Sequence, residues 1–244
     1  MKAILIGDNI TRLVLAKCLV NNNINVSLYS KPKLQKIDKI RTISISKKNL
    51  DFIQNSILKI SNKYLWDIDN IQIYQEYKQI KKILDFKNND KKLFSIVRNI
   101  ELYNLLNSKL KTNKRFKKIL IKKEKNLFSS FIKKNKSDII FNCDKDNEIS
   151  KMYSGKGIKK NYLGKAYVSI IKHEKIQNNT AYQIFTRKGP IAFLPTSNYS
   201  TSIVFSMIKK KDYSDKEIIK LINFYNLHYK ILSIGKIRSF NLKF

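Results

Sequence analysis

The residues most suited to chemistry lie at the start of the chain, where a short apolar run ends at Gly7. The segment from Gly7 to Arg12 stands where dinucleotide-binding proteins carry a Gly-x-Gly-x-x-Gly turn, which brings a pyrophosphate close to the backbone at a helix N-terminus. Only the first glycine is present. Asn9 replaces the second and can still adopt a left-handed backbone. Arg12 replaces the third, where a small residue allows close helix–strand packing. The pattern is compatible with a cofactor site and with a merely structural βαβ unit.

No second catalytic apparatus is visible in the sequence. His173 lies in a segment rich in Lys and Glu that suggests a turn, and His228 lies on an expected helix. We interpret both as surface or packing residues, because neither has a Cys, Asp or Glu at metal-ligand spacing. Cys18 and Cys143 are the two cysteines and form no disulfide framework. Neither a Ser-His-Asp arrangement nor a P-loop is present. We therefore predict no catalytic side chain and no metal site.

The element that must position the N-terminal turn is a βαβ unit. Apolar residues recur with helical period from Leu13 to Val20, and an alternating strand pattern runs from Ile24 to Tyr29. Parallel strands joined by a helix place this segment in the α/β class. The second strand ends at Ser30, where an acid would bind a ribose in a dinucleotide fold.

In the rest of the chain apolar and polar residues alternate less regularly, and patterns typical of strands become frequent toward its end. Gly155 and Gly157 predict a loop, and Gly189-Pro190 a turn. Helices are expected at 50–60, 100–110 and 216–229, a hairpin at 119–121 with 127–132, and further strands at 71–74, 93–97, 139–143, 167–171, 180–186, 191–194 and 202–207.

The composition is strongly basic, with a net charge of +32 and 50 Lys and Arg residues. Arginine occurs only six times, although specific base readout and bidentate phosphate binding favour it. Abundant Lys, Ile and Asn spread along the whole chain suggest codon drift in an AT-rich genome. Attraction to an anionic membrane surface and binding to nucleic acid are the two other interpretations. No apolar run approaches the roughly 18 residues of a membrane span, and the first residues predict neither a signal nor a transit peptide.

Four blocks in the second half of the chain carry the most specific pattern. They read NYLGKAY at 161–167, TAYQIF at 180–185, GPIAFLP at 189–195 and SIVFS at 202–206. Their order and spacing resemble the substrate-domain sheet of the FAD-dependent aromatic-ring hydroxylases of ubiquinone biosynthesis, which are flavoprotein monooxygenases acting on polyprenylated phenols. A turn and a strand of any β-rich domain is the alternative interpretation of the third block.

Earlier segments match the same family. Arg41 opens a segment that is similar to one in which an arginine approaches the flavin nucleotide, and Arg98 lies at a strand-to-helix step where related monooxygenases contact the cofactor. A solvated arginine at a helix start is the alternative for Arg98. Asp144 resembles the aspartate of the family's A-D-G segment, although Lys145 stands at the glycine and Ser150 is two places late. The resemblance implies five cofactor-binding residues, namely Gly7, Asn9, Arg41, Arg98 and Asp144.

The resemblance implies an α/β fold in which a Rossmann-like FAD-binding parallel sheet accompanies a β-rich substrate domain, as in p-hydroxybenzoate hydroxylase. Residues 1–155 would form the FAD domain and residues 156–244 the substrate domain. The implied activity is FAD-dependent hydroxylation of a polyprenylphenol, with NAD(P)H or another reductant as electron donor. The implied partners are the polyprenylated phenol, other ubiquinone-biosynthesis proteins and a peripheral membrane surface, with no nucleic acid. The expected location is cytoplasmic, with room for peripheral contact at the inner membrane.

The family places a strand and a G-D-A-A-H-type segment after the helix that corresponds to residues 216–229, and its aspartate binds the ribityl chain. Residues 235–242 resemble the lead-in to that segment. We therefore expect an incomplete fold that is cut off before the motif. The alternative is a truncated or degenerate non-catalytic homologue that acts as a partner subunit.

Overall fold

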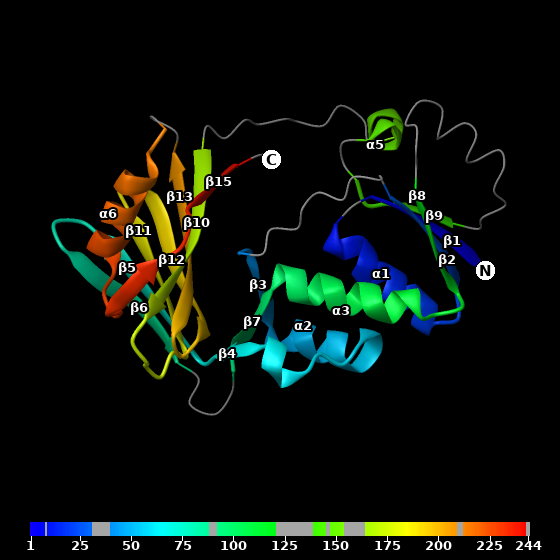
Figure 1. Cartoon of the computed structure of the whole chain (residues 1–244), viewed down its shortest axis with the longest axis horizontal. Helices are drawn as coiled ribbons and strands as arrows, with labels where there is room; N and C mark the ends of the chain where they lie inside the picture. Colours follow the sequence, from blue (N-terminus) through cyan, green and yellow to red (C-terminus); the bar gives the residue numbers. More distant parts are fainter. Residues whose placement is uncertain are drawn as a thin grey trace. The chain divides into compact units, whose positions relative to one another are not determined.

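In the computed structural model the chain forms two compact units (Figure 1). The parallel-sheet unit comprises residues 1–38, 51–60 and 99–158, and the β-rich unit comprises residues 39–50, 61–98 and 159–244. Residues 39–50 and 61–98 belong to the β-rich unit, although a single division at residue 155 would place them in the first domain. The structure describes residues 1–7, 9–30, 40–87, 92–120, 139–144, 147–153, 164–208 and 212–242.

The parallel-sheet unit is built on four parallel strands, which lie in the order β8 (Phe116–Leu120), β2 (Asn25–Ser30), β1 (Lys2–Ile6) and β9 (Ile139–Asn142). Ala3 of β1 is in register with Val26 of β2 on one side and with Ile139 of β9 on the other. The predicted adjacency of the two N-terminal strands is confirmed. Because β2 and β8 lie on one side of β1 and β9 on the other, the strand order reverses between β1 and β9.

Two helices of this unit lie side by side (Figure 1). They are α1 (Ile10–Asn21) and α3 (Asn99–Lys111). Leu102, Leu106 and Leu110 of α3 are buried at successive turns, which gives this helix one apolar face. The short helix α5 (Glu148–Tyr153) follows β9.

The helix expected at residues 50–60 is interrupted in the structure. Helix α2 (Lys47–Phe52) continues as a π-helical turn, η1 (Ile53–Ile57). The Asn21 amide, at the end of α1, donates to the carbonyls of Ser56 and Ile57 at 3.1 and 2.8 Å. Ser56 and Ile57 lie in the last turn of η1, where carbonyl groups have no partner within the helix, and these bonds satisfy them.

The β-rich unit contains a small antiparallel sheet and a large one. The small sheet has the order β3 (Thr42–Ser46), β7 (Phe94–Arg98), β4 (Trp66–Ile68), and the 3₁₀ turn η2 (Asn62–Tyr64) precedes β4. The large sheet has eight strands, all antiparallel except for the β11–β5 pair. Its order is β14 (Ile231–Ile234), β10 (Gly164–His173), β13 (Ser200–Ile208), β12 (Gly189–Ser197), β11 (Thr180–Thr186), β5 (Asn70–Glu76), β6 (Ile80–Lys87), and β15 (Arg238–Asn241) also pairs with β10.

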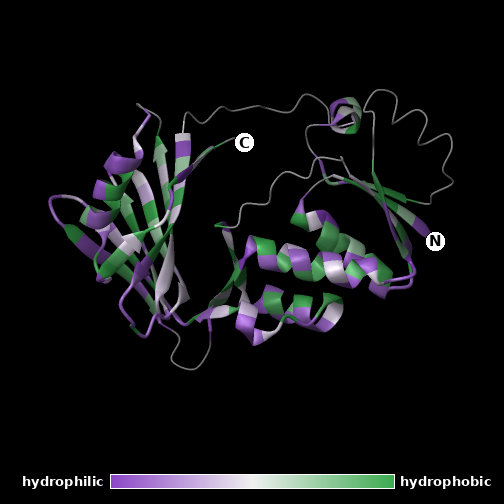
Figure 2. Ribbon diagram, viewed as in Figure 1, coloured by the Kyte–Doolittle hydropathy of each residue, from purple (hydrophilic) through white to green (hydrophobic). Residues whose placement is uncertain are grey.

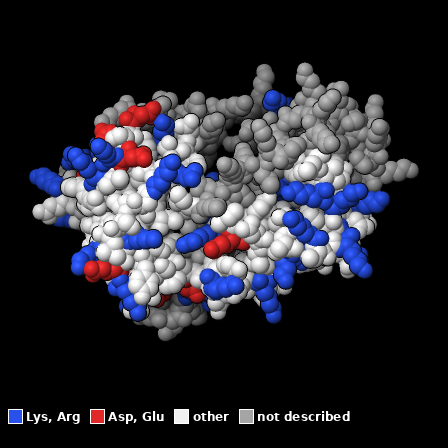
Figure 3. Space-filling model, in the orientation of Figure 1, with Lys and Arg blue, Asp and Glu red and all other residues white. Residues whose placement is uncertain are grey.

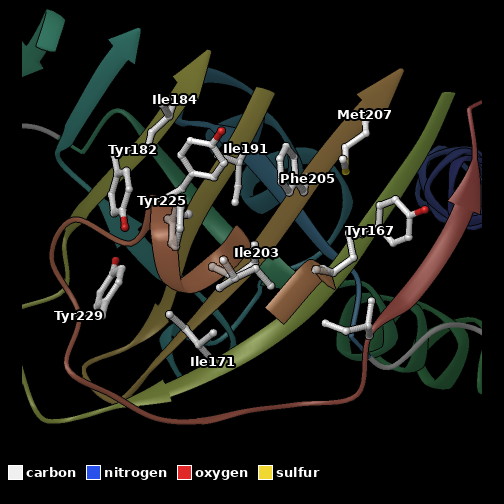
Figure 4. Close-up of a cluster of buried hydrophobic side chains, with 14 residues drawn as sticks. Tyr167, Ile171, Tyr182, Ile184, Ile191, Ile203, Phe205, Met207, Tyr225 and Tyr229 are labelled. Carbon is white, nitrogen blue, oxygen red and sulfur yellow. The ribbon is translucent and has the colours of Figure 1, made fainter. Parts of the chain in front are cut away.

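One face of the large sheet packs against helix α6 (Asp215–Tyr225) and forms the core of this unit (Figure 4). Alternate strand residues point to that face, as the spacing of Tyr182 with Ile184 and of Ile203 with Phe205 shows. Hydrophobic residues, drawn in green in Figure 2, recur along these strands. Ser214 begins α6 with a capping box, because its hydroxyl accepts from the Glu217 amide and the Glu217 carboxylate accepts from the Ser214 amide.

Most expected strands are found, with local differences at their ends. The residues expected as a Gly189-Pro190 turn begin β12, and the turn itself consists of residues 187 and 188. The reason is that the backbone of Gly189 has a φ of +126°, which lets it enter the sheet directly after the turn. Of the expected hairpin, the first strand lies in β8 and pairs with β2, whereas residues 127–132 lie outside the described residues, as do Gly155 and Gly157.

The two histidines lie in other elements than expected, but both pack, which is one of the two roles expected for them. His173 is not in a turn but ends β10, where it is buried. Its Nε2 lies 3.0 Å from the Thr201 hydroxyl, and its ring lies 4.4 Å from that of Tyr229. His228 follows α6, which ends at Tyr225. Both act in packing: the His228 ring is 4.8 Å from that of Tyr182, and burial lowers its pKa.

Lys and Arg side chains are spread over the described surface seen in Figure 3 rather than gathered in one patch. Among the described residues, no helix is long and apolar enough to cross a membrane.

Gly189 gives a direct test of the β-rich fold. A Cβ atom at this residue would lie 2.1 Å from the Ser206 carbonyl oxygen, and its φ is one that other residues rarely adopt. We expect Gly189→Ala to lower the free energy of unfolding by more than about 2 kcal/mol in denaturant titration. Lys188→Ala, one residue away and exposed, should change it by less than about 0.5 kcal/mol. Equal stability of the two variants would contradict this packing.

Candidate functional site

The turn between β1 and α1 lies at the point where the strand order reverses, which is where open α/β sheets bind their ligands. Gly7 has a φ of +133° there. A Cβ atom at Gly7 would lie 3.1 Å from the carbonyl carbon of Cys143 and 3.3 Å from the amide nitrogen of Asp144. The end of β1 therefore approaches the end of β9 so closely that the chain requires a glycine at this residue.

The Asn9 side chain links the start of α1 to the loop that follows β9. Its backbone is extended, with φ −122° and ψ 171°, so the left-handed conformation considered for it is not the one observed. The Asn9 Oδ1 accepts from the Arg12 amide at 3.1 Å and caps α1. Its Nδ2 donates to the Cys143 carbonyl at 2.6 Å. One side chain thus fixes both the start of α1 and the loop after β9.

Arg12, in place of the third glycine, is fully buried. Its guanidinium folds back along the turn, and Nη1 donates to the Gly7 carbonyl. Burial raises the pKa of the Cys143 thiol, and the positive charge of Arg12 partly offsets this rise. The space that a third glycine would leave between helix and strand is therefore occupied by a cationic side chain.

The loop after β9 is held by a polar cluster that places Asp144. The Asn142 Nδ2 donates to the Ser150 hydroxyl at 2.8 Å, and its Oδ1 accepts from the Asp144 amide at 3.2 Å. The Ser150 hydroxyl donates to the Asp144 carbonyl at 2.5 Å. Asn147 shares a further pair of hydrogen bonds with Asn142. Although Ser150 stands two places late relative to the family pattern, it closes the loop on Asp144.

Arg41 and Arg98 lie in the β-rich unit, at one end of the β3–β7 pair. Arg41 directly precedes Thr42, the first residue of β3, and Thr42 is in register with Arg98. Both arginines are exposed. The Arg41 guanidinium lies 5.6 Å from the ring centroid of Phe240 on β15, within the range of a cation–π interaction.

The structure therefore brings the five expected residues into two groups. Gly7, Asn9 and Asp144 converge in the parallel-sheet unit, and Arg41 and Arg98 lie near one end of the β3–β7 pair in the β-rich unit. Sequence reasoning missed Asn142 and Phe240. Asn142 could have been found from the sequence, because it ends an expected strand just before Asp144. Phe240 could not, because its contact with Arg41 depends on the pairing of β15 with β10.

Comparisons with known proteins bear on the fold. No protein-family model matches the sequence, and no curated protein has a similar sequence. Solved structures are similar in fold. A probable FAD-dependent monooxygenase, PqsL from Pseudomonas aeruginosa, has 10% sequence identity and a TM-score of 0.64, and the match covers 91% of this chain and 63% of PqsL. CtdE, solved with FAD and a substrate, has 11% identity and a TM-score of 0.61, over 93% of this chain and 63% of CtdE.

A geranylgeranyl bacteriochlorophyll reductase-like protein from Thermoplasma acidophilum is also similar, with 9% identity and a TM-score of 0.64 over 98% of this chain and 66% of that protein. The chain thus has the mixed α/β fold of these structures, with a Rossmann-like parallel sheet and a β-rich sheet, and spans 63% of the length of PqsL and CtdE.

The backbone of the β1–α1 turn fits a dinucleotide. The positive φ of Gly7, its close approach to Cys143 and the reversal of strand order are the features of a pyrophosphate-binding turn. The side chains of Asn9 and Arg12 narrow this turn, because one spans to Cys143 and the other fills the space beside Gly7. We therefore expect this turn to bind a dinucleotide weakly.

Asn9 is a sensitive test of how the turn is held. We expect Asn9→Ala to lower the free energy of unfolding by about 1–2 kcal/mol, because it removes both the cap of α1 and the bond to Cys143. Asn22→Ala at the other end of α1 is the matched control, since it removes one exposed bond to the Cys18 carbonyl. Chemical denaturation should show the larger loss for Asn9→Ala, and the reverse order would contradict the role given to Asn9.

Proposed function

We propose that the chain belongs to an FAD-dependent monooxygenase and contributes its nucleotide-binding turn. The observation that carries the proposal is the approach of Gly7 to the Cys143 backbone at the reversal point of a parallel sheet, in a fold shared with FAD-dependent monooxygenases. A helix N-terminus with its backbone amides favours an anion such as a pyrophosphate.

In this proposal Gly7 and Asn9 face the pyrophosphate, and Asp144 is held by Ser150 and Asn142 beside them. Arg41 and Arg98 are exposed cations of the β-rich unit, and the family resemblance assigns both of them to cofactor binding. The flavin, reduced by NAD(P)H or another donor, supplies the oxygen chemistry. The protein binds and orients the reactants and excludes water, so the lack of a catalytic His or Ser is compatible with hydroxylation.

We further propose that the substrate is the aromatic ring of a polyprenylphenol in ubiquinone biosynthesis. The support is the set of four sequence blocks, whose described residues lie on β10, β11, β12 and β13 of the large sheet. The third block begins at Gly189, where the contact with Ser206 requires a glycine. These blocks therefore define one continuous part of the sheet rather than unrelated strands.

A second candidate is a degenerate homologue that keeps the fold, does not catalyse hydroxylation and acts as a partner subunit. Arg12 favours it, because a buried arginine fills the space that the third glycine of the fingerprint would leave. Asn9 favours it too, because its side chain spans the turn to Cys143.

FAD titration separates these candidates. We expect weak FAD binding by the unaltered chain and at least about tenfold tighter binding by the Asn9→Gly/Arg12→Gly variant, because glycines reopen the turn. Flavin absorbance at about 450 nm after gel filtration measures the bound fraction. Asn9→Gly alone, checked for folding by circular dichroism, serves if the double variant unfolds. A folded glycine variant that binds no FAD would contradict the flavoprotein proposal. An unaltered chain that binds one FAD per molecule would contradict the idea that Asn9 and Arg12 narrow the turn.

Oxygen incorporation tests the substrate. With FAD in excess, a reductant and labelled O₂, the hydroxylase proposal predicts one labelled oxygen atom in the ring of a polyprenylphenol, detected by mass spectrometry. An FAD-saturated chain that leaves the phenol unlabelled would favour the partner that does not catalyse hydroxylation.

A further inference from the structure

The hairpin of β5 and β6, at the edge of the large sheet, exposes several large apolar side chains. Tyr77 is 74% exposed, Ile83 47%, Leu84 48% and Phe86 49%. Single apolar residues on a surface are ordinary, but four within ten residues of one hairpin form a patch. We call these four residues the hairpin patch. Figure 1 shows the hairpin at the edge of the β-rich unit.

The pairing of the hairpin places Leu84 and Phe86 on one face of the sheet. Ile71 is in register with Phe86, and Ile73 with Leu84, so the side chains of both pairs share this face. Tyr74, on the opposite face of β5, packs against the core under α6. A register shift between Ile73 and Tyr74 interrupts the ladder opposite Ile83, which exposes two successive apolar residues of β6.

The charges around the patch are mostly positive. Lys78, Lys81 and Lys87 are exposed and have no acidic partner among the described residues. The two acidic residues of the hairpin are engaged. Asp85 lies 2.6 Å from the Lys82 ammonium, and Glu76 accepts bonds from the Arg187 amide and the Tyr225 hydroxyl.

We propose that the hairpin patch docks onto an anionic lipid surface. Aromatic and aliphatic side chains that enter the headgroup boundary, flanked by lysines that stay at the phosphates, are the combination that binds such a surface. A second copy of the chain is a poor occupant, because each copy carries a net charge of +32. Nucleic acid would use the lysines but not Leu84 and Phe86. The proposal does not depend on FAD binding.

Vesicle co-sedimentation tests it with the full chain. We expect binding to phosphatidylcholine vesicles that contain about a third phosphatidylglycerol, and much weaker binding to phosphatidylcholine alone. Leu84→Ser/Phe86→Ser should lower the partition coefficient by about tenfold or more. Lys81→Gln/Lys87→Gln should lower it by about fivefold for each charge removed. These residues are exposed, so thermal unfolding should stay close to that of the unaltered chain.

Helix α6 of the same unit offers matched controls. Phe224 is 66% exposed, and Lys216 and Lys220 are exposed. Phe224→Ser and Lys216→Gln/Lys220→Gln should leave vesicle binding within about twofold of the unaltered chain, since α6 lies on the other face of the sheet. Equal losses for hairpin and α6 variants would overturn the proposal. So would a loss caused only by the lysine changes together with equally tight binding to duplex DNA, which would indicate general polyanion binding.

Discussion

At the ends of β1 and β9 two backbones approach each other so closely that a Cβ atom on Gly7 would lie 3.1 Å from the Cys143 carbonyl carbon. The other features of the site depend on this approach. It brings the Cys143 carbonyl within reach of the Asn9 amide, and it places the loop that holds Asp144 beside the start of α1. It also leaves the Gly7 carbonyl facing the helix, where the buried Arg12 donates to it. A side chain at Gly7 would be strained at its φ of +133° and would press against the Cys143 backbone, which would have to shift.

The β-rich unit is organised by a similar constraint. Gly189 enters β12 directly against the Ser206 carbonyl, which aligns the strands that carry the four family-like blocks. One face of this sheet is closed by α6 over a core of tyrosines and aliphatic residues, and the buried His173 joins the network of Thr201 and Tyr229. The other face stays partly apolar at the β5–β6 hairpin. The unit therefore combines a rigid core with a surface suited to an amphipathic partner.

Much of this arrangement could be predicted from the sequence where local pattern decides structure. The period of α1, the alternation in β2 and the strands β11 and β13 were all expected from their own residues. Features that depend on pairing between segments far apart in the sequence could not be predicted in this way. The cation–π contact of Arg41 requires β15 to pair with β10, and the assignment of residues 39–50 and 61–98 to the β-rich unit follows from pairing with later strands. Asn9 was expected in a left-handed turn but is extended, because it caps α1 and N-cap residues take this conformation; its bond to Cys143 depends on distant pairing.

The central claim is that the β1–α1 turn is the nucleotide-binding site. Titration of the isotope-labelled chain with FAD, followed by amide chemical shifts, tests it most directly, because weak binding still shifts the signals of contacting residues. The account predicts the largest shifts at Gly7, Asn9 and Asp144, and their loss in Gly7→Ala, while β11 to β13 keep their unliganded signals in that variant. Shifts confined to the β-rich unit, or a Gly7→Ala variant that responds like the unaltered chain, would contradict it.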